Sequence, residues 1–88
     1  MQDAIGLLEV SNLATAIICT DEMLKSAYVD IYDTQRIGSG IVTMMIKGEL
    51  ASVKEAIQIG EEIASRYGGL LTSKVIAKPY VKIDQLTK

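Results

Sequence analysis

The 88-residue chain contains no histidine, one cysteine and one proline, and these shortages exclude several kinds of chemistry. Histidine is the commonest general base and the commonest metal ligand, so its absence disfavours both catalysis and metal binding. The lone Cys19 permits no internal disulfide framework and no C-x-x-C metal or redox spacing. We therefore expect a protein of the reducing cytosol that is not an enzyme and binds neither a metal nor a cofactor.

Basic clusters and long apolar runs are also missing. The chain carries 9 lysines and arginines against 11 aspartates and glutamates, a net charge of −2, and no basic cluster is interleaved with aromatic residues. The chain lacks the concentration of positive charge that binds a phosphate backbone, so we expect no nucleic-acid partner. No apolar run approaches the roughly 18–20 residues that cross a bilayer, and residues 1–3 lack the basic start of a signal peptide. We expect neither export by a classical signal nor a membrane-spanning segment.

What the chain does have is apolar surface: 49% of its residues are hydrophobic and the mean hydropathy is +0.26. A domain of this size buries only roughly 60–65% of the surface that its unfolded chain exposes. Such an apolar balance is easier for a small soluble domain to carry when part of its surface meets partner subunits. The composition therefore favours one small domain, residues 1–88, that associates with itself.

Four segments have the alternating or continuous apolar pattern that is typical of strands. They lie at residues 4–10, 28–33, 41–47 and 70–77. Gly48 is predicted to end the third strand and Pro79 to end the fourth, because proline cannot continue a ladder of hydrogen bonds. Beyond them, Ile83 and Leu86 indicate a short C-terminal helix or turn.

Two further segments repeat apolar residues at helical spacing. The first helix begins after Ser11 or Asn12, either of which can cap it, and the second runs over 50–67 with Gly68 and Gly69 as its stop. The stripe predicted to be buried on the first helix consists of Leu13, Ala16, Ile17, Thr20, Leu24 and Ala27. On the second helix it consists of Val53, Ala56, Ile57, Gly60, Ala64 and Tyr67.

The order β-α-β-β-α-β, with the second helix repeating the first forty residues later, indicates an α+β ferredoxin-like sandwich. In this fold one four-stranded antiparallel sheet carries both helices on one face. The first and third strands are the more apolar and are predicted to lie in the middle, whereas Asp30, Asp33 and Lys74 suit the outer strands. The second and third strands would pair as a hairpin, with residues 38–40 near their connection.

The groups best suited to bind a ligand lie in one five-residue run, which consists of Arg36, Ile37, Gly38, Ser39 and Gly40. Two glycines bring backbone N–H groups and a hydroxyl to a loop tip, and beside an arginine such groups can form an anion nest. However, the run lacks the spacing of nucleotide-binding loops and is followed by a strand rather than a helix. The pattern by itself favours an ordinary hairpin connection over a ligand site, and both interpretations stay open.

The other polar side chains indicate no separate site. Four carboxylates without metal-loop or acid–base spacing are interpreted as solvated: Glu9, Asp30, Asp33 and Glu49. Cys19, beside the buried stripe of the first helix, is interpreted as a packing residue. Lys25 lies in the last turn of that helix, where a cation complements the helix dipole and can pair with Asp21 or Glu22. Its long side chain can also lie flat at a subunit edge.

Taken in order, these segments resemble one family. The chain is similar to the hexamer-forming bacterial microcompartment shell proteins at residues 4–9, 21–27, 36–43, 47–49, 53–56 and 75–79. The similarity covers nearly the whole chain, and its specificity comes from all the segments occurring together. The resemblance implies a structural function in which six copies form a flat disc and discs tile into shell facets. The shell would lie in the cytoplasm, include other shell proteins, enclose enzymes and pass small polar metabolites through a central pore.

The resemblance also assigns residues to these roles. It implies that the pore is lined by Gly38, Ser39 and Gly40. It places Arg36 and Ile37 near the pore, and Lys25 and Lys78 at the edge where hexamers meet. The chain departs from the usual family pattern at Ser11 and Asn12, at Arg36 and Lys78, and at Tyr28, where a small polar residue is common.

A second hypothesis comes from a different class of function. Ferredoxin-like domains also serve as small-molecule-binding regulatory domains, in which the glycine loop would bind a ligand at a dimer interface. This alternative rests on fold-level analogy alone. The two hypotheses differ in the size of the assembly that they require.

Overall fold

The computed structural model describes residues 3–78 and has the predicted order of elements. The elements are β1 (Asp3–Val10), α1 (Leu13–Ser26), β2 (Val29–Ile37), β3 (Ile41–Glu49), α2 (Leu50–Tyr67) and β4 (Leu70–Lys78). The bounds predicted for α2 are confirmed at both ends. The strand stop expected at Pro79 and the turn expected at Ile83 and Leu86 lie outside the described residues.

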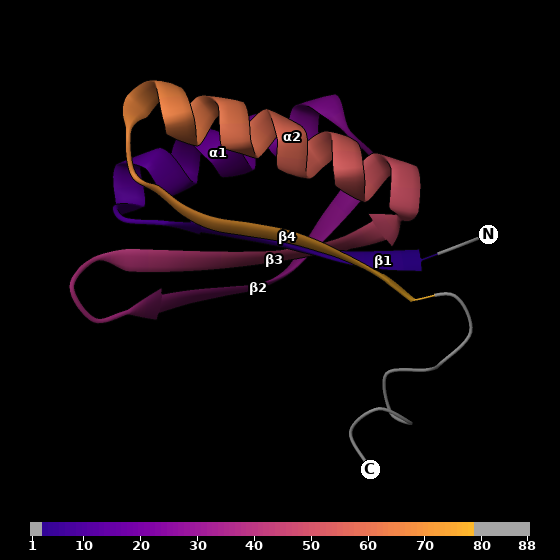
Figure 1. The fold of residues 1–88 in the computed structure, drawn as a ribbon, viewed down its shortest axis with the longest axis horizontal. Coiled ribbons are helices and arrows are strands. Elements are labelled where there is room, and N and C mark those ends of the chain that lie inside the picture. Colours follow the sequence, from indigo (N-terminus) through magenta and orange to yellow (C-terminus); the bar gives the residue numbers. More distant parts are fainter. Residues whose placement is uncertain (1–2, 79–88) are drawn as a thin grey trace, which may run out of the picture.

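The four strands form one sheet in the order β2-β3-β1-β4, and each neighbouring pair is antiparallel. Both helices lie on the same face of this sheet, and the other face carries no helix among the described residues (Figure 1). The α+β ferredoxin-like sandwich and the central placement of the first and third strands are therefore confirmed. A central strand has both edges paired and is better shielded from water than an outer strand, which suits the more apolar β1 and β3.

The core fills the space between the sheet and the helices. Along β1 every second residue faces the helices, beginning at Ala4 and ending at Val10. The helix α2 approaches the sheet closely, because a Cβ built at Gly60 would lie 2.7 Å from Leu8 Cδ2 and 2.9 Å from Met23 Sδ. Since real Cβ contacts are longer than this, a larger residue at position 60 would force the side chains of Leu8 and Met23 to shift.

Cys19 is fully buried in this core, which confirms its interpretation as a packing residue. Its thiol donates a hydrogen bond to the Gly60 carbonyl across a sulfur–oxygen distance of 3.5 Å. Burial disfavours the thiolate and raises the pKa of the Cys19 thiol above its usual value. The side chain is therefore held as a neutral thiol.

The buried stripe predicted for α1 is largely wrong. The residues of α1 that are buried are Thr15, Ala16, Cys19 and Met23. Leu13, Ile17 and Leu24 face solvent, with 60% of Ile17 exposed. The helix has apolar residues on two faces, and helical periodicity cannot tell which face the sheet covers.

Four smaller expectations also need correction. β2 extends to Ile37 rather than ending at residue 33, and Gly48 lies within β3 rather than ending it. Tyr67, predicted to be buried, is exposed, and Ile63 is buried instead. Glu9, interpreted as solvated, is half-buried and accepts a hydrogen bond. The extension of β2 has a physical reason: β2 is an outer strand with one free edge, so polar residues can continue it. The period-2 pattern does not reveal such an extension.

The first helix has a cap that can be tested directly. Asn12 is its N-cap, and the Asn12 side-chain oxygen accepts a hydrogen bond of 2.8 Å from the Thr15 backbone N–H. We expect Asn12→Ala to lower the free energy of unfolding by about 1 kcal/mol, because this N–H loses its partner. Asn12→Asp keeps the acceptor and should stay near wild type. Thermal unfolding at one fixed protein concentration measures both variants, and equal losses would contradict the capping role.

Candidate functional site

The hairpin between β2 and β3 forms one end of the molecule (Figure 1). Ile37 pairs with Ile41, and Gly38, Ser39 and Gly40 make the turn between them. All three turn residues are exposed. The predicted placement of this run at the connection of a hairpin is confirmed.

The backbone of this turn is left-handed at two successive residues. The φ angle is 72° at Ser39 and 85° at Gly40. Glycine adopts such angles without strain, whereas a residue with a Cβ does so at a cost of roughly 1 kcal/mol or more. Ser39 is the one non-glycine residue with positive φ among residues 3–78. A strained serine at an exposed tip is the kind of outlier that motivates a functional hypothesis.

Arg36 and Ile37 belong to β2 and not to the turn itself. Arg36 pairs directly with Val42, whose side chain is buried beneath the helices. Directly opposed residues of an antiparallel pair project from the same face of a sheet. The exposed guanidinium of Arg36 therefore extends from the helix-covered side, beside the turn rather than at its tip.

Two other loops lie at the same end and surround the base of the hairpin. The Ser11 backbone N–H donates a 2.8 Å hydrogen bond to the Gly69 carbonyl, which joins the β1–α1 connection to the α2–β4 connection. A Cβ at Gly40 would lie 3.5 Å from the Ser11 carbonyl oxygen, so the turn touches this pair of loops. The base of the turn is thus supported from two directions.

A polar contact between the central strands supports the hairpin from the helix-free face. Thr43 lies three residues after Gly40, and its hydroxyl donates a 2.8 Å hydrogen bond to a carboxylate oxygen of Glu9. Glu9 and Thr43 are paired residues of β1 and β3. Sequence reasoning missed this role because a glutamate beside apolar residues in a strand is also what a solvated position looks like.

The residues expected at the hexamer edge lie at the opposite end. Lys25 is in the last turn of α1, and its ammonium lies 3.2 Å from an Asp21 carboxylate oxygen, which confirms that predicted partner. This hydrogen bond, together with the nearby charges, raises the pKa of Lys25 above its usual value. Lys78 ends β4 and pairs with Asp3 at the start of β1. Since β1 runs toward the hairpin end, Lys78 lies at the other end of the sheet from residues 36–40, and the last turn of α1, which carries Lys25, lies at that other end too (Figure 1).

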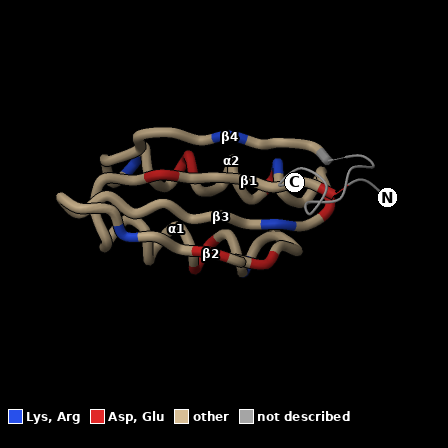
Figure 2. Tube along the Cα trace, turned by 90° about the horizontal axis from the view of Figure 1, so that it is seen from below, with Lys and Arg blue, Asp and Glu red and all other residues tan. Residues whose placement is uncertain are grey.

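Exposed apolar side chains gather along the two long sides of the sheet. On the β2 side, a shallow groove is lined by residues of α1, β2 and β3 that include Leu13, Ile17 and Leu24. On the opposite side, β4 exposes about half of both Leu71 and Ile76. Charged residues are few along β4, whereas β2 carries Asp30, Asp33 and Arg36 (Figure 2). These surfaces were not recognised in the sequence as exposed, because their residues have the composition of a core.

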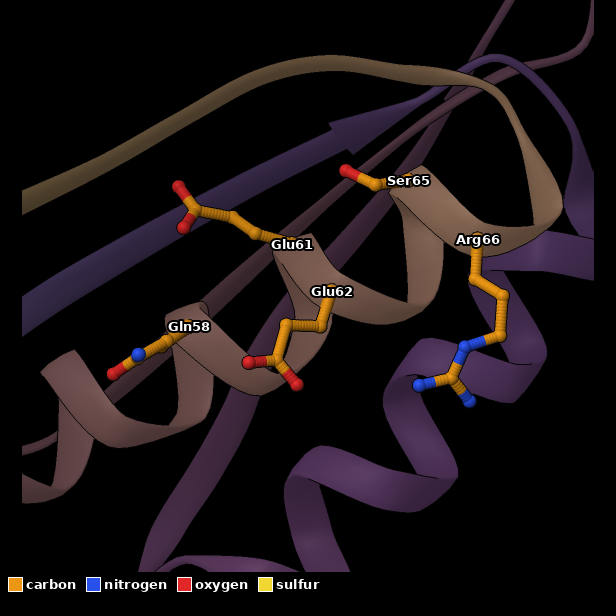
Figure 3. Close-up of a pocket in the computed structure, with 5 residues that line it drawn as sticks. All are labelled: Gln58, Glu61, Glu62, Ser65 and Arg66. Carbon is orange, nitrogen blue, oxygen red and sulfur yellow. The ribbon is translucent and has the colours of Figure 1, made fainter.

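A separate depression lies on the outer surface of α2 and does not have the features of a binding site. It is lined by Gln58, Glu61, Glu62, Ser65 and Arg66. All five come from one helix, and their side chains diverge rather than converge on a point (Figure 3). The Glu61 carboxylate already accepts a hydrogen bond from the Ser73 hydroxyl of β4. Among residues 3–78 no three acidic or cysteine side chains gather as metal ligands do.

Comparison with known proteins connects this arrangement to one family. A family model described as "BMC domain" matches residues 4–79. The bacterial microcompartment shell protein PduA of Citrobacter freundii is 34% identical over 85 residues, which cover 97% of this chain and 91% of PduA. The shell protein EutM of Escherichia coli K12 is 32% identical over 84 residues, which cover 96% of this chain and 87% of EutM.

A solved structure gives the same result. A microcompartment protein from Desulfitobacterium hafniense DCB superimposes with a TM-score of 0.83 at 30% sequence identity, covering 99% of this chain and 46% of that one. This chain therefore spans about half the length of that solved chain. The fold and the turn define a ferredoxin-like domain with an exposed glycine hairpin at one end. The chain belongs to the BMC domain family, the family in which the microcompartment shell proteins PduA and EutM are its relatives.

The two glycines of the turn provide a matched pair of substitutions. Gly40 has a φ of 85°, whereas a Cβ at Gly38 meets nothing within 4 Å and Gly38 has no positive φ. We expect Gly40→Ala to lower the free energy of unfolding by about 1 kcal/mol, because alanine is strained in the left-handed region. Gly38→Ala should change it by less than about 0.5 kcal/mol. Denaturant unfolding at a single protein concentration compares them, and equal stability of the two variants would contradict this geometry of the turn.

Proposed function

We propose that this protein is a structural subunit of a bacterial microcompartment shell. Residues 1–88 form one shell domain that assembles into cyclic homohexamers, and the hexamers tile into facets together with other shell proteins around encapsulated enzymes. The shell lies in the bacterial cytoplasm. The subunit itself acts as a wall with a pore and not as an enzyme.

The observation that carries this proposal is the placement of two sets of residues at opposite ends of one subunit. The turn of Gly38, Ser39 and Gly40 lies at one end, and Lys25 lies at the other. A radial subunit of a disc needs its axis-facing residues and its rim-facing residues to be separated in this way. Membership of the BMC domain family supports the same orientation.

The two apolar long sides of the sheet support closure into a ring. A cyclic ring uses a head-to-tail interface, in which one surface of a subunit meets a different surface of the next. The groove beside Ile17 and the β4 edge at Leu71 are two such surfaces, and they lie on opposite sides of the sheet. Burying them against each other removes exposed apolar surface from both.

Sixfold repetition gives the turn a chemistry that one copy lacks. Six Ser39 hydroxyls and their neighbouring backbone N–H groups would form one ring of donors and acceptors around the axis. Arg36 extends from the helix-covered side of the sheet and would add a positive field at that end of the pore, which favours small anions. Gly38 and Gly40 keep the ring narrow but open because they add no side chains, and Ile37 lies beside it.

The head-to-tail interface can be tested with two charged variants. We expect Ile17→Asp and Leu71→Asp each to prevent the hexamer, because each buries a carboxylate in one half of the interface. A mixture of the two variants retains one intact interface, between the groove of the Leu71→Asp subunit and the β4 edge of the Ile17→Asp subunit. Native mass spectrometry should then find a heterodimer and no larger ring. Hexamers of either variant alone, or a wild-type protein that stops at a dimer, would refute the proposed ring.

The pore is tested separately by transport. Ser39→Leu replaces the hydroxyl ring by six bulky apolar side chains, so we expect the entry of a small carboxylate into assembled shells to fall at least about tenfold. Ser39→Gly, which removes the side chain and the strained φ, serves as the open control. An encapsulated reporter enzyme measures the flux. Equal flux through the Ser39→Leu and wild-type shells would exclude Ser39 from the constriction.

A further inference from the structure

Tyr28 is the most exposed of the large apolar and aromatic side chains among residues 3–78, with 95% of its surface in solvent. It lies two residues after the end of α1, at the end of the molecule that carries Lys25. Tyrosine combines a large apolar ring with a polar tip and is enriched where proteins meet. A ring left almost wholly in water therefore indicates a contact that the isolated subunit does not make.

The backbone on either side of this ring is held by short contacts. The Val29 N–H donates a 3.0 Å hydrogen bond to the Ala27 carbonyl, which closes a three-residue turn with Tyr28 at its centre. The Ala27 N–H in turn donates to the Met23 carbonyl at 3.2 Å. On the other side, a Cβ at Gly48 would lie 3.0 Å from the Tyr28 carbonyl oxygen, so the strand packs tightly against this turn. The backbone at Tyr28 therefore needs little further ordering when the side chain binds.

A cation lies close to Tyr28 in the sequence. Lys25 precedes Tyr28 by three residues, and 66% of its side chain is exposed. The exposed ammonium is charged at neutral pH, and its pairing with Asp21 raises the pKa of Lys25 further. An ammonium is attracted to the face of an aromatic ring, because the ring quadrupole is negative above its plane. The two side chains are therefore complementary to a second copy of themselves.

We propose that Lys25 and Tyr28 of one hexamer contact Tyr28 and Lys25 of the adjacent hexamer, with each ammonium over the ring of the partner. Two identical discs that share an edge with the same face upward are related by a two-fold axis. Such an axis makes every contact reciprocal, so one edge gains two cation–π contacts from one pair of residues. The inference rests on the proposed function, because it requires hexamers that meet at the Lys25 end.

This contact differs from an ion pair between hexamers. Lys25 could instead reach the Asp21 or Glu22 of its neighbour, and Tyr28 would then be a bystander. A cation–π contact needs the ring face and not the hydroxyl, so phenylalanine should replace tyrosine whereas leucine should not. It also predicts that removing either partner removes the same interaction.

The experiment compares sheet assembly by wild type, Tyr28→Phe, Tyr28→Leu, Lys25→Met and the Lys25→Met/Tyr28→Leu double variant. Native mass spectrometry first establishes that each forms hexamers. Electron microscopy and sedimentation over a dilution series then give the lowest concentration at which sheets persist. We expect this concentration to rise about tenfold for Tyr28→Leu and for Lys25→Met, to rise no further in the double variant, and to stay near wild type for Tyr28→Phe.

Two results would overturn the contact while leaving the shell role intact: sheets of Tyr28→Leu that persist to wild-type dilution, and a Tyr28→Phe variant as weak as Tyr28→Leu. Additive losses in the double variant would also overturn it, because independent roles for the two residues add. A wild-type protein that forms no hexamer would instead refute the proposed function, and this inference with it. The outcomes thus separate the edge contact from the ring.

Discussion

The close crossing of α2 over β1 and against α1 is the constraint on which the rest of the structure depends. Gly60 allows the helix to approach until Leu8 and Met23 contact its backbone, and Gly6 does the same from the sheet, where a Cβ would lie 2.8 Å from Ile57 Cγ1. This crossing fixes both helices on one face of the sheet. The hairpin of β2 and β3 then extends to one end, while the last turn of α1 lies at the other.

The same packing explains why so much apolar surface remains exposed. Two helices on one face of the sheet bury the core residues between them and the sheet. The two long sides of the sheet and the outer face of α1 stay uncovered. Ile17 and Leu71 thus lie at surfaces that the fold creates but does not bury. In the proposed ring these surfaces would meet, so assembly would complete the burial that a chain of 88 residues begins. In this proposal the pore exists only in the ring: a single Ser39 is an exposed hydroxyl, whereas six of them would surround the path of small polar metabolites.

Much of the fold could be predicted from the sequence, because α2 has one apolar face and a glycine stop at Gly68, and because the apolar strands belong in the middle. The buried face of α1 could not, since Ile17 and Cys19 are equally apolar and only the presence or absence of a neighbouring surface distinguishes them. The glycines and the serine single out residues 36–40, but this pattern by itself favours an ordinary hairpin, and the assignment to a pore comes from the family resemblance. Within one subunit Lys25 pairs with Asp21 and Ser39 is exposed, and neither observation reveals the proposed role of the residue. Tyr28 is informative only through its exposure.

In the proposed hexamer, residues 38–40 of six subunits converge on one axis while Lys25 lies at the rim. Electron cryo-microscopy of the purified assembly tests this most directly, because it shows the symmetry of the particle and the radial position of the hairpin together. We expect a sixfold disc whose narrowest point is formed by the Ser39 side chains. A dimer, or a ring whose β2–β3 hairpins point outward, would contradict it.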